Sequence, residues 1–128
     1  MRRAVATDLP PETAPFSHAV VVGDWLYTAT LPVRPDGSVE TGSGAAQADA
    51  ALANLRQAVE AAGATLDDVG QVVVYLTRLE DKASMDEVYA RVFRKPYPSR
   101  VCVVVSALAV PGARIEIQAC AAVPAARR

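Results

Sequence analysis

The chain has 128 residues, of which 52% are hydrophobic and 21% charged, with a formal net charge of −1 and a pI near 5.8. This length favours one domain with its own core, so we expect a single domain over residues 1–128. A slightly acidic chain lacks the basic face with which nucleic-acid-binding proteins attract phosphate, and we therefore expect no nucleic acid partner.

Neither a membrane anchor nor a metal site is expected. No apolar run approaches the roughly 20 residues that a membrane-spanning helix needs, and no signal-peptide core precedes Pro10 and Pro11. Two cysteines and a single histidine, His18, do not suffice for a disulfide scaffold or a two-histidine metal site. We therefore expect a cytoplasmic protein in which His18 is an ordinary strand-end or interface residue.

The first strands are expected to form a β-hairpin. Residues 20–22 and 25–29 are rich in β-branched and aromatic side chains, and Gly23 with Asp24 between them forms a two-residue link typical of hairpins. Pro32 and the turn residues that follow it end the second strand and begin a polar loop.

Residues 45–62 change to a helical period. Apolar residues recur every three or four positions, and Gly63 follows as a stop signal. The apolar stripe consists of Ala48, Leu52, Leu55, Val59 and Ala62. We expect this helix to lie across one face of the sheet, with its polar residues Gln47 and Asn54 solvated or tied to a neighbouring loop.

A buried strand and a second helix are expected next. Residues 66–69 predict a single turn, and the apolar run 71–77 predicts a central strand of a covered sheet. Helical spacing returns over residues 83–93, where Ser84 and Glu87 have the spacing of a capping box. Prolines after this segment end the helix.

The last two predicted strands, residues 98–105 and 114–120, carry the charged groups of greatest interest. Because side chains alternate between the faces of a strand, Arg100 and Cys102 share one face of the first strand, and Glu116 lies on the polar face of the second. We expect these groups to converge. Two interpretations remain open: an Arg100–Glu116 ion pair between adjacent strands, or an open site where Arg100 grips a carboxylate and Glu116 holds water or moves a proton.

The resulting element order, β-β-α-β-α-β-β, predicts an α+β fold. Its architecture is a two-layer sandwich in which a mixed β-sheet carries two helices on one face. The other face also carries apolar side chains, among them alternate valines of residues 72–74 and 101–105. An apolar sheet face without a cover needs a partner, so we expect a homo-oligomer.

Several segments together resemble the RidA/YjgF family of reactive-intermediate (enamine/imine) deaminases. The most specific is the C-terminal signature, Pro-Ser-Arg at 98–100, an apolar alternation and Ile-Glu-Ile at 115–117. Residues 14–19 are similar to the family's opening GPYSQA-like motif, and residues 23–29 to its G…lyvSGq strand. With the first helix and the turn after it, the likeness covers almost the whole chain.

The resemblance implies a chorismate-mutase-like fold that forms a homotrimer with active-site clefts at the subunit interfaces. It implies hydrolysis of 2-imino or 2-enamino acids, released by pyridoxal-phosphate enzymes, to 2-oxo acids and ammonia, without a cofactor. By position, Arg100 would grip the substrate carboxylate, Glu116 would position or activate water, and Cys102 would line the pocket. Cys102 is not expected to be a nucleophile, because no histidine in the motif would activate it.

Four positions in the implied substrate pocket depart from the family pattern. Phe16 replaces the usual tyrosine and lacks its hydroxyl, Thr28 and Ala29 stand at the usual Ser-Gly, and Asp86 stands where many members carry asparagine. The methyl group of Ala29 would narrow the approach of a ligand to the backbone, and the carboxylate of Asp86 would repel an anionic substrate.

Three functions therefore stay open. The first is deamination of reactive imino or enamino acids. The second is a specialised pathway enzyme that cyclises, hydrolyses or condenses a related enamine, and the third is a non-catalytic trimeric module that binds small carboxylates through Arg100. RNA cleavage, another label attached to the family, is a weaker prediction for an acidic chain without a basic aromatic stripe.

Overall fold

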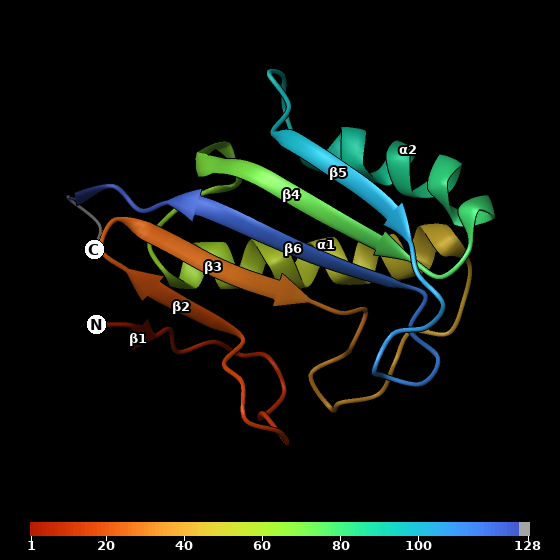
Figure 1. The fold of residues 1–128 in the computed structure, drawn as a ribbon, viewed down its shortest axis with the longest axis horizontal. Coiled ribbons are helices and arrows are strands. Elements are labelled where there is room, and N and C mark those ends of the chain that lie inside the picture. The colour runs from red at the N-terminus through yellow and green to blue at the C-terminus, as the bar shows by residue number, and fades with distance from the viewer. Residues whose placement is uncertain (126–128) are drawn as a thin grey trace.

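A six-stranded mixed sheet carries both helices on one face, as Figure 1 shows for the computed structural model, which describes residues 1–125. The elements in chain order are β1 (Arg3–Ala4), β2 (Ala19–Val22), β3 (Trp25–Thr30), α1 (Gly44–Ala61), the 3-10 turn η1 (Leu66–Asp68), β4 (Val69–Leu76), the 3-10 turn η2 (Leu79–Asp81), α2 (Lys82–Val92), β5 (Ser99–Val104) and β6 (Ile115–Ala122). The strand order across the sheet is β1-β2-β3-β6-β4-β5. The β4–β5 pair is parallel and the other pairs are antiparallel. The predicted α+β two-layer fold is confirmed.

The core lies between the sheet and the helices, which are behind the sheet in Figure 1. The apolar stripe of α1 contributes Leu52 and Leu55, and the facing strands contribute Val72, Val74 and Ile117; each is at most 1% exposed. Burying one such side chain stabilises a fold by about 1.5–3 kcal/mol. The helical period recognised in the sequence therefore corresponds to the face that builds this core.

The helix ends follow local chemistry. Ser43 caps α1, because its hydroxyl accepts a hydrogen bond from the backbone N–H of Ala46 at 3.1 Å. Gly63, just beyond the helix, has φ +87°, a conformation that glycine adopts at little cost. The predicted capping box of Ser84 and Glu87 is wrong, because η2 leads directly into α2 and the helix begins earlier, at Lys82. Ser84 instead lies within the first turn of the helix.

The front face of the sheet in Figure 1 has no helix over it. Strand alternation places large apolar side chains on this face, among them Trp25 and Tyr27 of β3 and Val101 and Val103 of β5. These four side chains are between 38% and 49% exposed. Contiguous exposed apolar surface is common at protein–protein interfaces.

Candidate functional site

Arg100 lies on the helix side of β5 and is held by α2. Its sheet neighbours in register are Val72 and then Ala119, both buried under the helices. The Arg100 guanidinium lies 2.8 Å from Asp86 Oδ1. It also lies 4.8 Å from the centre of the Tyr89 ring, a cation–π arrangement. Two residues of α2 therefore fix the direction of this guanidinium.

Asp86 stands between two cations. Its second carboxylate oxygen accepts a hydrogen bond from Lys82 Nζ at 2.7 Å, in addition to the ion pair with Arg100. Burial opposes ionisation of Asp86, but the hydrogen bonds and charges of Lys82 and Arg100 outweigh it, and the pKa of Asp86 lies below its ordinary value. Asp86 is therefore a carboxylate that occupies part of the binding capacity of Arg100.

A cavity of about 320 Å³ opens beside this cluster, lined by Asp86, Tyr89, Tyr97, Pro98 and Arg100. Tyr89 is 5% exposed, and its hydroxyl has no hydrogen-bond partner among residues 1–125. Burial raises the pKa of Tyr89 to about 12. The hydroxyl therefore stays protonated, as a donor without an acceptor.

Cys102 shares the helix-side face of β5 with Arg100 and packs against the core. Burial raises the pKa of the Cys102 thiol, although the nearby charges of Arg100 and Lys82 oppose this effect. A thiol with a raised pKa supplies little thiolate at neutral pH, which makes it a poor nucleophile. The expectation that Cys102 lines a pocket and does not attack the substrate stays a prediction.

Glu116 lies on the other face of the sheet. Its neighbours in register are Tyr75 and then Val103, on the uncovered side. The Glu116 side chain makes no hydrogen bond or ion pair with another residue in the described part of the chain. Burial raises its pKa above the ordinary value, so its carboxylate is a stronger base than that of a solvated glutamate.

Glu116 borders a cavity of about 570 Å³. Phe16 and Ala29, two of the residues expected in the substrate pocket, line the same cavity. Its walls come from the N-terminal segment before β2, the loop after β3 and the loop after β5, which lie at one end of the sheet in Figure 1. Three segments distant in sequence therefore surround one carboxyl group.

Arg100 and Glu116 do not meet within one chain. The strand β4 lies between β5 and β6, and the two side chains point to opposite faces of the sheet. The expected convergence of Arg100, Cys102 and Glu116 is wrong for a single chain. Of the two interpretations left open, the Arg100–Glu116 ion pair between adjacent strands is also wrong for a single chain. Alternation shows which residues of one strand share a face, but it does not show which face of a neighbouring strand they match.

Thr28 is also placed away from the Glu116 cavity. It is 6% exposed and pairs in register with Ala119 on the helix side, one residue out of phase with Ala29. Its hydroxyl donates to the backbone carbonyl of His18 at 2.7 Å. The Thr28 side chain therefore supports the chain path at His18 and does not reach this cavity.

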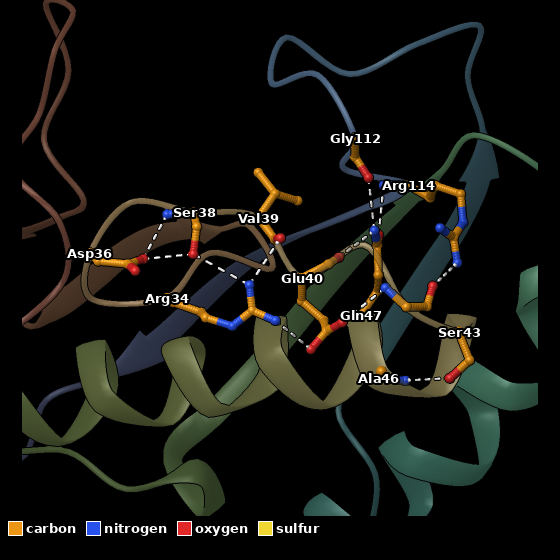
Figure 2. A network of polar contacts seen from close by, with 11 residues as sticks. Arg34, Asp36, Ser38, Val39, Glu40, Ser43, Ala46, Gln47, Gly112 and Arg114 are labelled. Atoms are coloured by element: carbon orange, nitrogen blue, oxygen red, sulfur yellow. Dashed lines mark hydrogen bonds and ion pairs between the residues drawn. The ribbon is translucent and has the colours of Figure 1, made fainter.

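Two amides of α1 hold the loops that wall the cavity. Gln47 is 1% exposed, and its Nε2 donates to the carbonyls of Glu40 at 2.7 Å and Gly112 at 2.8 Å, while its Oε1 accepts from Arg114 N at 2.7 Å. Figure 2 shows this amide between the two loops. Farther along the helix, Asn54 Nδ2 donates to the carbonyls at positions 31 and 33, both at 2.8 Å. The expectation that these side chains tie the helix to a loop is confirmed.

Sequence reasoning missed several of the residues around both cavities. Lys82 was detectable, because Lys82 and Asp86 stand four residues apart on a predicted helix, the spacing of a helical ion pair. Leu31, Val33 and Val110 line the Glu116 cavity from loops. The sequence pattern does not mark these three residues, because side chains in a loop do not follow the regular spacing of a strand or a helix.

Comparisons with known proteins identify the family of this chain. A family model described as Endoribonuclease L-PSP matches residues 7–123. The chain belongs to the RidA/YjgF family. The human protein named 2-iminobutanoate/2-iminopropanoate deaminase is 32% identical to it over 124 residues, which cover 94% of this chain and 90% of the human protein. A RutC family protein of Sinorhizobium fredii is 39% identical over 114 residues, which cover 88% of this chain and 90% of that protein.

Solved structures of this family have the same fold. RidA from the Antarctic bacterium Psychrobacter is 34% identical, with a TM-score of 0.88, and the match covers 94% of this chain and 99% of that one. TdcF of E. coli, solved with bound serine, is 30% identical with a TM-score of 0.88, covering 95% and 99%. Residues 1–125 contain no helix that meets the requirements of a membrane span. In the same range, no group of three or more potential ligand side chains could hold a metal ion.

Proposed function

We propose that this protein hydrolyses reactive 2-imino and 2-enamino acids to 2-oxo acids and ammonia. The observation that carries the proposal is Glu116, an unpaired carboxyl with a raised pKa at the edge of a ligand-sized cavity. Family membership and the deaminase names of relatives from human and mite support it. Arg100 binds the substrate carboxylate and Glu116 positions the attacking water.

The reaction needs few groups. Water attacks C2 of the iminium while Glu116 accepts a proton from it, and the C=N electron pair moves to nitrogen. The resulting carbinolamine receives the proton on nitrogen. Glu116 then accepts the hydroxyl proton of the carbinolamine as the C–N bond breaks, so ammonia leaves and the carbonyl of the 2-oxo acid forms. A 2-enamino acid first takes a proton at C3 to become the iminium. Orientation and charge stabilisation suffice for these steps, so we propose that the enzyme works without a cofactor. We also propose that it acts in the cytoplasm.

We further propose that the site is completed by a second copy of the chain. Arg100 and Glu116 lie on opposite faces of one sheet, so a ligand that touches both must lie between two chains. The uncovered apolar face supplies a surface for such an association. A closed ring of three chains, with a site at each interface, satisfies both requirements.

A coupled assay tests the activity. A threonine dehydratase generates 2-iminobutanoate, and its decay is followed with and without the purified protein. We expect accelerated decay, lost in Glu116→Gln, while binding of a 2-oxo acid by the same variant persists. No acceleration by the folded protein would overturn the deaminase proposal, and full activity of Glu116→Gln would overturn the role of that residue.

Mixing two impaired variants tests the shared site. Arg100→Ala and Glu116→Gln are unfolded together, refolded as a mixture and assayed. In a ring, about one quarter of the sites then combine an intact Arg100 from one chain with an intact Glu116 from its neighbour. We expect activity near that fraction of the parent and a light-scattering mass of three chains. A mixture as inactive as its components would contradict a site shared between chains.

Binding without catalysis is the second candidate, favoured by one observation. Arg100, Lys82 and Asp86 form a cluster with one net positive charge beside a cavity, an arrangement that suits a small carboxylate. The related TdcF structure contains bound serine, an amino acid with such a group. Glu116→Gln separates the candidates, because a binding module keeps its ligand affinity and has no turnover to lose.

A further inference from the structure

The Glu116 cavity is large for the substrates named in its relatives. Its volume is about 570 Å³, against about 320 Å³ for the cavity beside Arg100. Pockets of roughly 300–1,000 Å³ hold drug-sized ligands. The side chain of 2-iminopropanoate is a methyl group and that of 2-iminobutanoate an ethyl group, so either would fill only a small part of the space that a single chain offers beside Glu116.

The wall of this cavity is mainly apolar. Phe16, Leu31, Val33 and Val110 line it together with Ala29. The Phe16 ring is 52% exposed, so its apolar surface is free to contact a ligand. A wall of this chemistry gains free energy only when it covers apolar surface of a ligand.

Three polar side chains in the same wall are already engaged with backbone carbonyls. Asn54 donates to residues 31 and 33, Thr30 Oγ1 donates to Ala51 O at 2.9 Å, and His18 Nε2 is 2.5 Å from Pro10 O. Glu116 is the titratable group of the wall without such a partner. The cavity thus presents one reactive carboxyl and a mainly apolar surface.

The walls are also held apart. The loop after β3 is fixed by Asn54 and Gln47, and the loop after β5 is fixed by Gln47 through Gly112 and Arg114. Both loops are thus hydrogen-bonded to one helix, which fixes the paths of the two walls. A preformed pocket binds its ligand without first ordering its walls.

From these observations we infer that the preferred substrates are 2-imino acids with bulky branched or aromatic side chains, which the cavity receives while Glu116 directs water to C2. The inference rests on the proposed deaminase function and narrows it to a substrate class. Each buried methylene contributes about 0.8 kcal/mol, which corresponds to about a fourfold gain in kcat/KM. A leucine-derived imine should therefore exceed an alanine-derived imine by at least about tenfold.

The experiment compares imines of increasing size under one condition. An L-amino-acid oxidase generates them from alanine, 2-aminobutanoate, leucine and phenylalanine, and kcat/KM of the purified protein is measured for each. In parallel, calorimetry gives Kd for pyruvate, 4-methyl-2-oxopentanoate and phenylpyruvate. We expect both series to favour the bulky members.

The turnover and binding measurements test the substrate preference and the deaminase function separately. Turnover of all imines without preference for the large ones overturns the inference and leaves the deaminase proposal standing. Absence of turnover, with tighter binding of the larger 2-oxo acids, supports the cavity assignment and overturns the deaminase proposal. Absence of turnover with no dependence of binding on size overturns both.

A pair of variants locates the preference. Val110→Phe fills the cavity and should reduce the ratio of leucine-derived to alanine-derived activity by at least about tenfold. Ala107→Phe places the same ring in the same loop outside the cavity wall and should leave the ratio unchanged. Circular dichroism verifies that both variants fold. An unchanged ratio in folded Val110→Phe would show that the substrate side chain lies elsewhere.

Discussion

Charged side chains are paired on one face of the sheet and unpaired on the other. On the helix side, Asp86 pairs with both Arg100 and Lys82, so this cluster carries one net positive charge. On the uncovered side, Glu116 has no countercharge among residues 1–125, and burial raises its pKa. A paired cation is suited to anchoring a carboxylate, whereas an unpaired carboxyl is suited to moving a proton. The comparison assigns anchoring and chemistry to different faces of one sheet.

Among changes on the helix side of the sheet, removing Arg100 should have the largest effect on activity. Arg100→Ala should lower kcat/KM by about tenfold to a hundredfold, from a loss of about 1.5–3 kcal/mol of charge-assisted binding. Arg100→Lys should restore only part of it, because an ammonium lacks the planar fork. Steady-state kinetics and melting temperature are measured on the same samples.

Stability should change little in Arg100→Ala. Asp86 keeps Lys82 as a partner and is partly exposed, so the loss should be below about 1 kcal/mol. A large fall in melting temperature together with unchanged specific activity would show that Arg100 is structural, and would remove the anchoring role of the helix side.

Removing the carboxylate of Asp86 should strengthen substrate binding by Arg100 and so increase the difference between the two faces of the sheet. Asp86→Asn removes the carboxylate that competes with the substrate for Arg100, so KM for an imino acid should fall about threefold to tenfold, on the order of 1 kcal/mol. The gain should shrink at high salt, since partly exposed charges are screened. Asp67→Asn is the matched control, because Asp67 pairs with Arg94 and lines neither site cavity. An equal response of both variants would exclude competition at Arg100.

Glu116 should cost stability at neutral pH. Its pKa is raised in the folded chain, so the folded state binds more protons than the unfolded state just above the ordinary value of 4.5, and stability falls as pH rises through the folded pKa. Glu116→Gln should therefore melt at a slightly higher temperature than the parent at neutral pH, and the difference should vanish below that value. Melting curves of both proteins between about pH 4 and about pH 8 check this difference in melting temperature. A variant that is less stable at neutral pH would indicate that the ionised carboxylate has a partner.

The smallest effect is expected at Tyr89. Its hydroxyl is buried without a hydrogen-bond partner, so Tyr89→Phe removes an unsatisfied group and should be neutral or stabilise by up to about 1 kcal/mol. Chemical denaturation measures this difference. Loss of stability, or a rise in KM in the same variant, would show that the hydroxyl binds a group of the assembled site.

Most of the fold was predictable because periodicity is local. The first predicted helix, residues 45–62, corresponds to α1 (Gly44–Ala61), and the second, residues 83–93, corresponds to α2 (Lys82–Val92). The two-residue strand β1 carries no period and was not predicted. The sequence pattern also does not contain the position of β4 between β5 and β6, which depends on pairing between distant segments.

The candidate site was predictable in composition but not in geometry. Phe16, Ala29 and Glu116 line one cavity, and Asp86 with Arg100 line another. Their separation onto two faces follows from strand register, which a single strand does not reveal. Ion pairing of Asp86 with Arg100 likewise depends on how α2 packs beside β5, which no helical spacing specifies.

The bonds of Gln47 and Asn54 have a consequence for divergence among relatives. Both amides hold the cavity loops by backbone atoms, which are the same whatever side chain a position carries. Side chains at Leu31, Val33 and Val110 are therefore free to be exchanged while the path of each loop persists. Natural selection can in this way replace the lining of the cavity one residue at a time without losing its shape, and new substrate preferences become reachable through single mutations.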